Sequence, residues 1–182
     1  MAPGTDWKYN GGTTQVLAAI IERTSGQKID AFANKNLFQP LGIKEFEWVK
    51  YPGTSEFAAA SGLRLRSRDL LKFGLLYLNE GLWEGRQIVP ADWVKNSIEP
   101  HIKIEKDISA YGYQFWLFND SIRNKPVHIV ACVGNGDQRI FIDKSQRLVI
   151  VATAGNYNLW EIKNNVAELL RQFVYPALPG IR

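Results

Sequence analysis

The sequence has few of the residues that support redox or metal chemistry. Its 182 residues include one cysteine, Cys132, and two histidines, His101 and His128. A single cysteine cannot form an internal disulfide, and neither histidine has a cysteine or histidine partner at the spacing of a metal site. The simplest interpretation is a small core cysteine and two surface or packed histidines. We therefore expect no metal and no other cofactor.

Long apolar runs and blocks of like charge are also absent. No uninterrupted apolar run approaches the roughly 18 residues of a membrane-spanning helix. The formal net charge is only +4, and basic residues alternate with acidic ones, as in K-I-E-K at 103–106. This pattern does not favour nucleic acid as a partner. With 46% apolar residues the chain has the composition of a folded protein with a core.

The first half of the chain has the spacing of helices. Apolar residues recur at helical intervals in the segments before Gly26, after Ser67 and after Pro90. Pro90 is expected at the first position of its helix. The pattern predicts helices over 13–25, over 28–37, from Ser67 to Gly81 and from Pro90, with a short strand over 46–49.

After about residue 108 the apolar period changes from 3.6 to 2. We expect strands over 111–118, 127–133, 139–143 and 148–154, the last two forming a hairpin, and a final helix over 159–175. Short turns between successive strands predict an antiparallel sheet, and the apolar stripe of the final helix can cover one face of it. The sequence thus predicts an α+β protein with a mainly helical lobe, 1–105, and a sheet with a C-terminal helix, 106–182.

A search for nucleophile motifs finds one literal S-x-x-K, from Ser25 to Lys28. The motif works when both residues share a helix face, because the lysine amine then accepts the serine proton. Gly26 ends the first helix between them, so no shared face exists and we expect no catalytic role. The sequence has no G-x-S-x-G elbow either.

Two positions stay open on the residues alone. Tyr9 lies directly before the first helix, but a phenol acts as a base only beside a cation, so packing is its favoured interpretation. The turn 134–138 presents backbone N–H groups that can bind an oxyanion, although most such turns are structural.

Five segments form a pattern along the chain: P-G-T-D-W-K-Y-N at 3–10, L-A-A-I-I-E at 17–22, L-F-Q-P-L-G at 37–42, S-G-L-R-L at 61–65 and G-N-G-D-Q at 134–138. In their order and spacing they resemble the serine β-lactamase-like hydrolases, a family of class C β-lactamases, DD-peptidases and esterases. The resemblance implies the β-lactamase/transpeptidase-like α+β fold. It also implies attack on an ester or amide carbonyl through an acyl-enzyme.

The resemblance also assigns roles to individual residues. Tyr9 matches the catalytic tyrosine, which helps to move the proton of the serine. Gly134 matches the glycine of the K/H-T-G motif, so the backbone N–H of Asn135 would be one of two oxyanion donors. The implied catalytic residues are Tyr9 and Asn135, and the implied substrate-binding residues are Asn10, Gly11, Gly134 and Gln138.

The sequence departs from the family pattern at three places. Gly11 replaces the asparagine of Y-x-N, unless Asn10 substitutes for it. Cys132 replaces the cation of K/H-T-G, which favours the esterase or amidase branch over an efficient β-lactamase. Asp137 replaces a common glycine and is expected to put a carboxylate beside the oxyanion position.

In the family, the helix with S-x-x-K precedes the tyrosine motif, and here only eight residues precede Tyr9. We therefore expect the C-terminal part of such a hydrolase, inactive alone, with the N-terminal part of the fold missing. The expected result is an unpaired sheet edge over 148–154 and an uncovered sheet face.

Other interpretations stay open. The chain could be a non-catalytic remnant that binds a ligand or partner, and it could self-associate or pair with the missing N-terminal segment through the sheet edge. The expected ligand is a small ester, amide or β-lactam-like molecule. Only the family suggests a periplasmic or other extracytoplasmic location.

Overall fold

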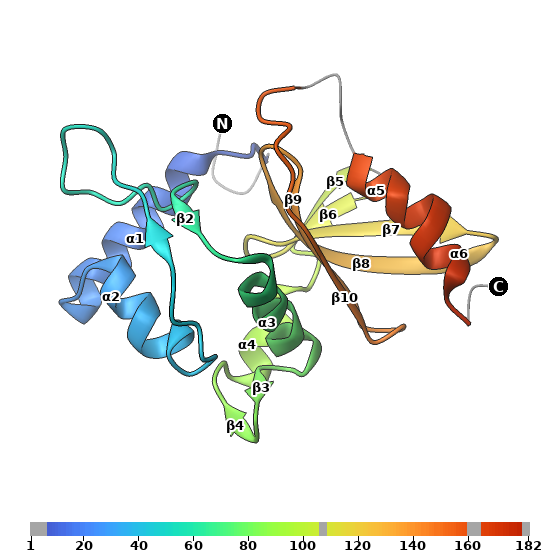
Figure 1. The fold of residues 1–182 in the computed structure, drawn as a ribbon, viewed down its shortest axis with the longest axis horizontal. Coiled ribbons are helices and arrows are strands. Elements are labelled where there is room, and N and C mark those ends of the chain that lie inside the picture. The colour runs from blue at the N-terminus through green and yellow to red at the C-terminus, as the bar shows by residue number, and fades with distance from the viewer. Residues whose placement is uncertain (1–6, 106–108, 160–164, 180–182) are drawn as a thin grey trace. The chain divides into compact units, whose positions relative to one another are not determined.

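A computed structural model describes residues 7–105, 109–159 and 165–179. The chain forms two compact units, residues 1–69 and residues 70–182. Figure 1 traces both along the chain from blue to red. The expected division of the chain between residues 105 and 106 stays a prediction.

The first unit is mainly helical. It contains α1 (Gly11–Ser25), α2 (Ile29–Ala33), the π-helical turn η1 (Asn34–Phe38) and a two-residue antiparallel pair of β1 (Glu47–Trp48) with β2 (Leu63–Arg64). The Asn10 side chain caps α1, and Gly26, with a φ of 67°, ends it. The predicted helices over 13–25 and 28–37 and the strand over 46–49 are confirmed.

The second unit starts within α3 (Ser67–Leu78) and continues through β3 (Leu82–Trp83), β4 (Arg86–Gln87) and α4 (Ala91–Ser97). Asp69 lies in the first turn of α3, where its charge favours the helix. The helix predicted from Ser67 is confirmed. The helix after Pro90 is confirmed with one correction, because Pro90 is its N-cap and not its first helical residue.

Six antiparallel strands form the sheet of the second unit, in the order β10-β9-β8-β7-β6-β5. They are β5 (Ile102–Glu105), β6 (Ser109–Tyr111), β7 (Trp116–Ile122), β8 (Lys125–Gly134), β9 (Gln138–Asp143) and β10 (Leu148–Ala152). Each strand pairs with the next in sequence, and the predicted hairpin of β9 and β10 is confirmed. In the described sheet, β10 pairs with β9 alone and forms an edge.

The single strand predicted over 111–118 is wrong. The chain turns between β6 and β7, where the Gly112 N–H donates to the Phe115 carbonyl at 2.9 Å. A Cβ at Gly112 would lie 2.3 Å from the Ser97 carbonyl oxygen, so this turn passes too close to another backbone for a side chain. The sequence pattern also missed β5.

Both faces of the sheet carry helices. On one face the C-terminal helical segment, α5 (Asn165–Leu169), η2 (Leu170–Val174) and α6 (Tyr175–Ala177), packs on Val127, Ala131 and Phe141 (Figure 1). On the other face, side chains of α3 and α4 such as Tyr77 and Val94 pack with Ile140 and Ile142. The expected uncovered face is therefore wrong, because α3 and α4 supply its cover. The predicted start of the last helix lies outside the described residues.

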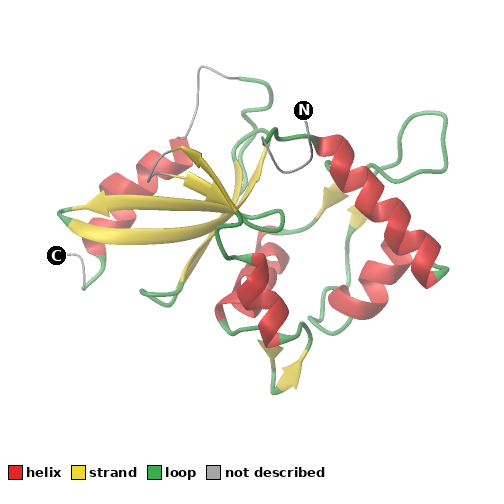
Figure 2. Cartoon of the chain, turned by 180° about the vertical axis from the view of Figure 1, so that it is seen from behind, coloured by secondary structure: helices red, strands yellow, loops and turns green. Residues whose placement is uncertain are grey.

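The figures show where the helices and the strands lie along the chain. Figure 2, from behind, shows the long strands of the second unit, in yellow, beside its helices in red. The fold is α+β, as the sequence predicts. It is the second unit that contains the turn 134–138.

Candidate functional site

Tyr9, Asn10 and Gly11 lie together where α1 begins. Tyr9 is 54% exposed. The Asn10 Oδ1 accepts the Gly12 N–H at 2.8 Å and thereby satisfies a free helix donor. Asn10 therefore uses its side-chain oxygen for the helix and offers a ligand only its amide N–H groups. A Cβ at Gly11 would lie 3.6 Å from the Ala60 Cβ, an ordinary contact distance, so there is room for a side chain at this position.

Ser25 and Lys28 have structural roles, as expected. Ser25 is the last residue of α1, and its Oγ donates to the Ile21 carbonyl at 2.6 Å. The Lys28 Nζ lies 2.9 Å from Glu22 Oε2 and 3.1 Å from Glu56 Oε1. The hydrogen bond to Glu22 raises the pKa of Lys28 and keeps the amine protonated, so it cannot act as a base.

Gly134, Asn135 and Gln138 come together in the tight turn 134–138 between β8 and β9. Gly134 pairs with Gln138, and two successive residues, Gly136 and Asp137, have left-handed φ angles of 78° and 66°. Among the described residues, the hydrogen bonds of Asn135 are made by its side chain, and its backbone N–H has no acceptor. This turn therefore presents a backbone donor with no protein partner in that part of the chain.

The carboxylate of Asp137 is turned into the core. It is 6% exposed; its Oδ2 accepts the Val166 N–H at 3.0 Å, and its Oδ1 lies 2.8 Å from Arg139 Nη2. Val166 is in the first turn of α5, so Asp137 satisfies an end of the C-terminal helix. The expected carboxylate beside the oxyanion position stays a prediction, and in the structure these buried partners hold both oxygens of Asp137.

Cys132 lies on β8 and packs with the apolar residues beneath α3 and α4. Burial raises its pKa to about 12. At neutral pH the side chain is an uncharged thiol, and it supplies neither the cation nor the hydroxyl of a K/H-T-G motif. This position cannot hold an anionic group of a substrate.

The predicted site residues thus form two groups, Tyr9 with Asn10 and Gly11 on the first unit, and Gly134 with Asn135 and Gln138 on the second. The sequence analysis missed Asn158, which binds Asn135, and the partners of Asp137. The local signal for Asn158 was weak, since an asparagine after a strand is typical of an ordinary turn.

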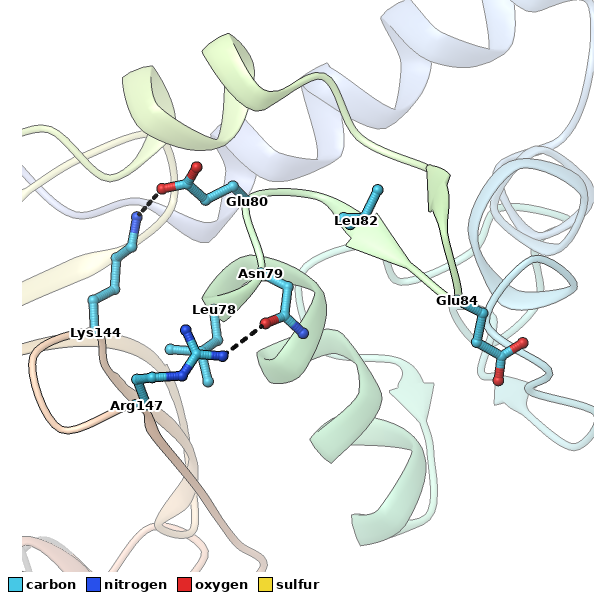
Figure 3. Close-up of a pocket in the computed structure, with 7 residues that line it drawn as sticks. All are labelled: Leu78, Asn79, Glu80, Leu82, Glu84, Lys144 and Arg147. Atoms are coloured by element: carbon cyan, nitrogen blue, oxygen red, sulfur yellow. Dashed lines mark hydrogen bonds and ion pairs between the residues drawn. The ribbon is translucent and has the colours of Figure 1, made fainter.

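A separate pocket of about 420 Å³ lies on the second unit (Figure 3). It is lined by Leu78, Asn79, Glu80, Leu82, Glu84, Lys144 and Arg147. Lys144 Nζ pairs with Glu80 Oε1 at 3.0 Å, and Arg147 donates to Asn79 Oδ1 at 3.4 Å. Its polar groups largely bind each other, and none of the predicted site residues lines it.

In residues 7–105, 109–159 and 165–179, no group of three or more His, Cys, Asp or Glu side chains is arranged to hold a metal ion. Within the same ranges, every helix is too short or too polar to cross a membrane.

Comparison with known proteins places the chain. The sequence model of one family, described as Beta-lactamase, matches residues 1–161. The chain belongs to the beta-lactamase family. It is 26% identical over 137 residues to an uncharacterized protein of Alkalihalophilus pseudofirmus, an alignment that covers 64% of this chain and 40% of that protein.

Solved structures of beta-lactamase-like proteins share the fold. A Bacillus anthracis protein assigned as a 6-aminohexanoate-dimer hydrolase superposes with a TM-score of 0.73 at 24% identity, covering 86% of this chain and 40% of that one. An octameric penicillin-binding protein homologue from Pyrococcus abyssi gives 0.66 at 17% identity, covering 93% and 44%. The present chain therefore spans less than half the length of these relatives.

Proposed function

We propose that this chain supplies part of the active site of a β-lactamase-like serine hydrolase that cleaves an ester or amide through an acyl-enzyme. The observation that carries the proposal is the turn 134–138, whose Asn135 N–H is without an acceptor among the described residues while its side chain is tied down. A fixed backbone donor of this kind stabilises the oxyanion of a tetrahedral intermediate.

Tyr9 would take the second role, assisting transfer of the serine proton. A phenol with a pKa of about 10 does this only if a nearby cation stabilises the phenolate. In the family this cation is the lysine of S-x-x-K. Lys28 cannot replace it, because two carboxylates already hold its charge. Asn10, Gly11, Gly134 and Gln138 would contact the substrate around these two groups.

We also propose that the 182 residues alone have no hydrolase activity. Ser25 is bonded to its own helix, so a serine–lysine pair has to come from outside the sequence. The test uses the chain alone and the chain fused to an S-x-x-K segment of a family member, with a p-nitrophenyl ester and a chromogenic cephalosporin as substrates. We expect no turnover by the chain alone and turnover by the fusion.

The matched variants are Tyr9→Phe and Tyr51→Phe, two exposed tyrosines of the first unit. Tyr9→Phe should lower the activity of the fusion about 10²- to 10⁴-fold, the usual contribution of general acid–base catalysis. Tyr51→Phe should leave it unchanged. Turnover by the chain alone that Tyr9→Phe abolishes, or a fusion indifferent to Tyr9→Phe, would contradict the proposal.

The substrate is proposed to be an uncharged ester or linear amide. Cys132 is a partly buried, neutral thiol and cannot form an ion pair with the carboxylate of a β-lactam. The resemblance to an assigned 6-aminohexanoate-dimer hydrolase supports a linear amide. The fusion should therefore cleave the ester faster than the cephalosporin, and the reverse order would contradict this part.

A second candidate is a non-catalytic module that binds a partner at the edge strand β10, whose L-V-I-V-A sequence pairs on one side only in the described sheet. The octameric assembly of the Pyrococcus abyssi homologue supports self-association as one form of this candidate. Size-exclusion chromatography with light scattering tests it, and a monomer at all concentrations would count against it. Thermal stabilisation by penicillins or peptidoglycan fragments would instead indicate ligand binding.

A further inference from the structure

The turn 134–138 is fastened to the loop 153–158 that follows β10. Asn135 and Asn158 bind reciprocally: Asn135 Nδ2 donates to Asn158 Oδ1 at 2.9 Å, and the Asn158 N–H donates to Asn135 Oδ1 at 3.2 Å. Gln138 Nε2 donates to the Ala154 carbonyl, and Gly136 forms a β-bridge with Asn156. Two segments about 20 residues apart are thus joined by side-chain and backbone contacts.

The packing around this junction leaves little freedom. A Cβ at Gly136 would lie 2.7 Å from Cδ1 of the Tyr157 ring, and Gly136 has a φ of 78°, so this position requires glycine for two reasons. Asn158 has a φ of 58°, in the left-handed region that asparagine, aspartate and glycine tolerate best. The ring of Tyr157 and the amide of Asn158 therefore hold the turn from the same loop.

We propose that Asn158 is a positioning residue, and that the reciprocal amide pair of Asn135 and Asn158 aims the Asn135 backbone N–H at the substrate oxygen. The proposal rests on the proposed function for that N–H. Both polar atoms of the Asn135 amide are bound, so the side chain cannot turn without breaking two hydrogen bonds. An oriented donor stabilises an oxyanion more than a mobile one, because no energy is spent on orienting it during the reaction.

Asn135 and Gly136 also provide a chemical reporter of this clamp. In an asparagine–glycine pair the glycine backbone nitrogen, after losing its proton to base, attacks the asparagine Cγ. A C–N bond forms, ammonia leaves with the amide nitrogen, and water opens the resulting succinimide to aspartate or isoaspartate. The attack requires the Asn135 side chain to leave Asn158, so the rate of deamidation measures how often the clamp opens.

The chain contains a reference for this measurement. Asn10 and Gly11 form a second asparagine–glycine pair, on the other unit, where the Asn10 oxygen caps α1. Peptide-resolved mass spectrometry of the complete chain at mildly alkaline pH gives both rates in one sample. A change common to both pairs reports global unfolding, whereas a change in their ratio reports the clamp.

The decisive variants are Asn158→Gly and Asn158→Asp. Glycine keeps the left-handed backbone and the backbone N–H but loses the oxygen that accepts from Asn135, whereas aspartate keeps both interactions. Asn158→Gly should raise the Asn135-to-Asn10 deamidation ratio about fivefold, the factor expected for one hydrogen bond, and Asn158→Asp should leave it nearly unchanged. An unchanged ratio in Asn158→Gly, or an equal rise in both variants, would overturn the clamp.

The aiming role has its own readout in the fusion that carries S-x-x-K. Asn158→Gly should lower kcat about tenfold or more with KM unchanged, and Asn158→Asp should restore it. A kcat that Asn158→Gly does not change would overturn the positioning role. The deamidation ratio needs no activity, so an inactive fusion would count against the proposed function and leave the test of the clamp intact.

Discussion

The two units of the chain differ in how much apolar surface they bury. In the second unit two extended clusters on opposite faces of one sheet include Leu170 and Tyr175 on one side and Tyr77 and Val94 on the other. The first unit buries only a few apolar side chains, and α1 leaves Val16, Leu17 and Ile20 between 46% and 60% exposed. Since apolar burial is the main source of stability, the second unit should be the more stable part of the chain and the first unit the less stable part.

The largest expected effect contrasts a buried residue of α3 with an exposed residue of α1. Leu76 of α3 is completely buried, so Leu76→Ala should cost about 2–5 kcal/mol of the free energy of unfolding through lost burial and a cavity. Ile20→Ala on α1 removes an exposed side chain and should cost less than about 1 kcal/mol. Urea denaturation of both variants measures the difference. Equal losses would show that α1 is covered in solution.

A second contrast concerns two helical glycines. A Cβ at Gly74 of α3 would lie 2.4 Å from Val149 Cγ1 and 3.0 Å from Ile140 Cγ2. Gly74→Ala should therefore cost about 1–3 kcal/mol by overpacking, although alanine favours a helix. Gly11→Ala on α1 meets only an ordinary contact with Ala60 and should cost nothing measurable. A stabilised Gly74→Ala variant, seen as a higher midpoint of thermal unfolding, would contradict the close approach of α3 to the sheet.

The same comparison explains what the sequence could predict. The strongly periodic segments α1, α3 and β8 to β10 were predicted because their pattern repeats over many residues. The break of the strand at Gly112 was not predicted, because it depends on the close approach of the Ser97 carbonyl to Gly112. A contact between separate segments leaves no periodic pattern in the sequence. The two residues of β2 are too few to show any alternation.

The candidate site shows the same limit. Tyr9 and the turn 134–138 were found through motifs that are contiguous in sequence. The partners of Asp137 and Asn135, Val166 and Asn158, lie 29 and 23 residues away. Local propensity can indicate that a polar residue needs a partner, but only the tertiary packing of the C-terminal helix and of the loop after β10 on the sheet decides which partner it meets.

The third prediction is a pH dependence confined to the second unit. Burial raises the pKa of Cys132 from 9.0 to about 12, so between these values the unfolded chain loses a proton that the folded chain keeps. Because the unfolded state then binds fewer protons, stability falls as pH rises, by at most about 1.4 kcal/mol per pH unit. Below about pH 9 the Cys132 thiol is protonated in both states, so its ionisation does not lower the stability there. Urea denaturation from pH 8 to 11 should show this loss, and Cys132→Ala should reduce its slope. An identical slope in both proteins would indicate that other groups cause it.

The smallest effect is expected from the ion pairs of the first unit. Lys28 contacts Glu22 and Glu56 at the surface, where solvent screening and the cost of ordering long side chains leave only a small net contribution to stability. Lys28→Met should lower stability by no more than this, and 1 M NaCl should remove most of the difference. Asp137 and Arg139 are largely buried in the second unit, so salt should not compensate for the loss of stability in Asp137→Ala. If both variants lose the same amount of stability with the same salt dependence, the two ion pairs are equally exposed to solvent. The two units would then not differ in the burial of their ion pairs.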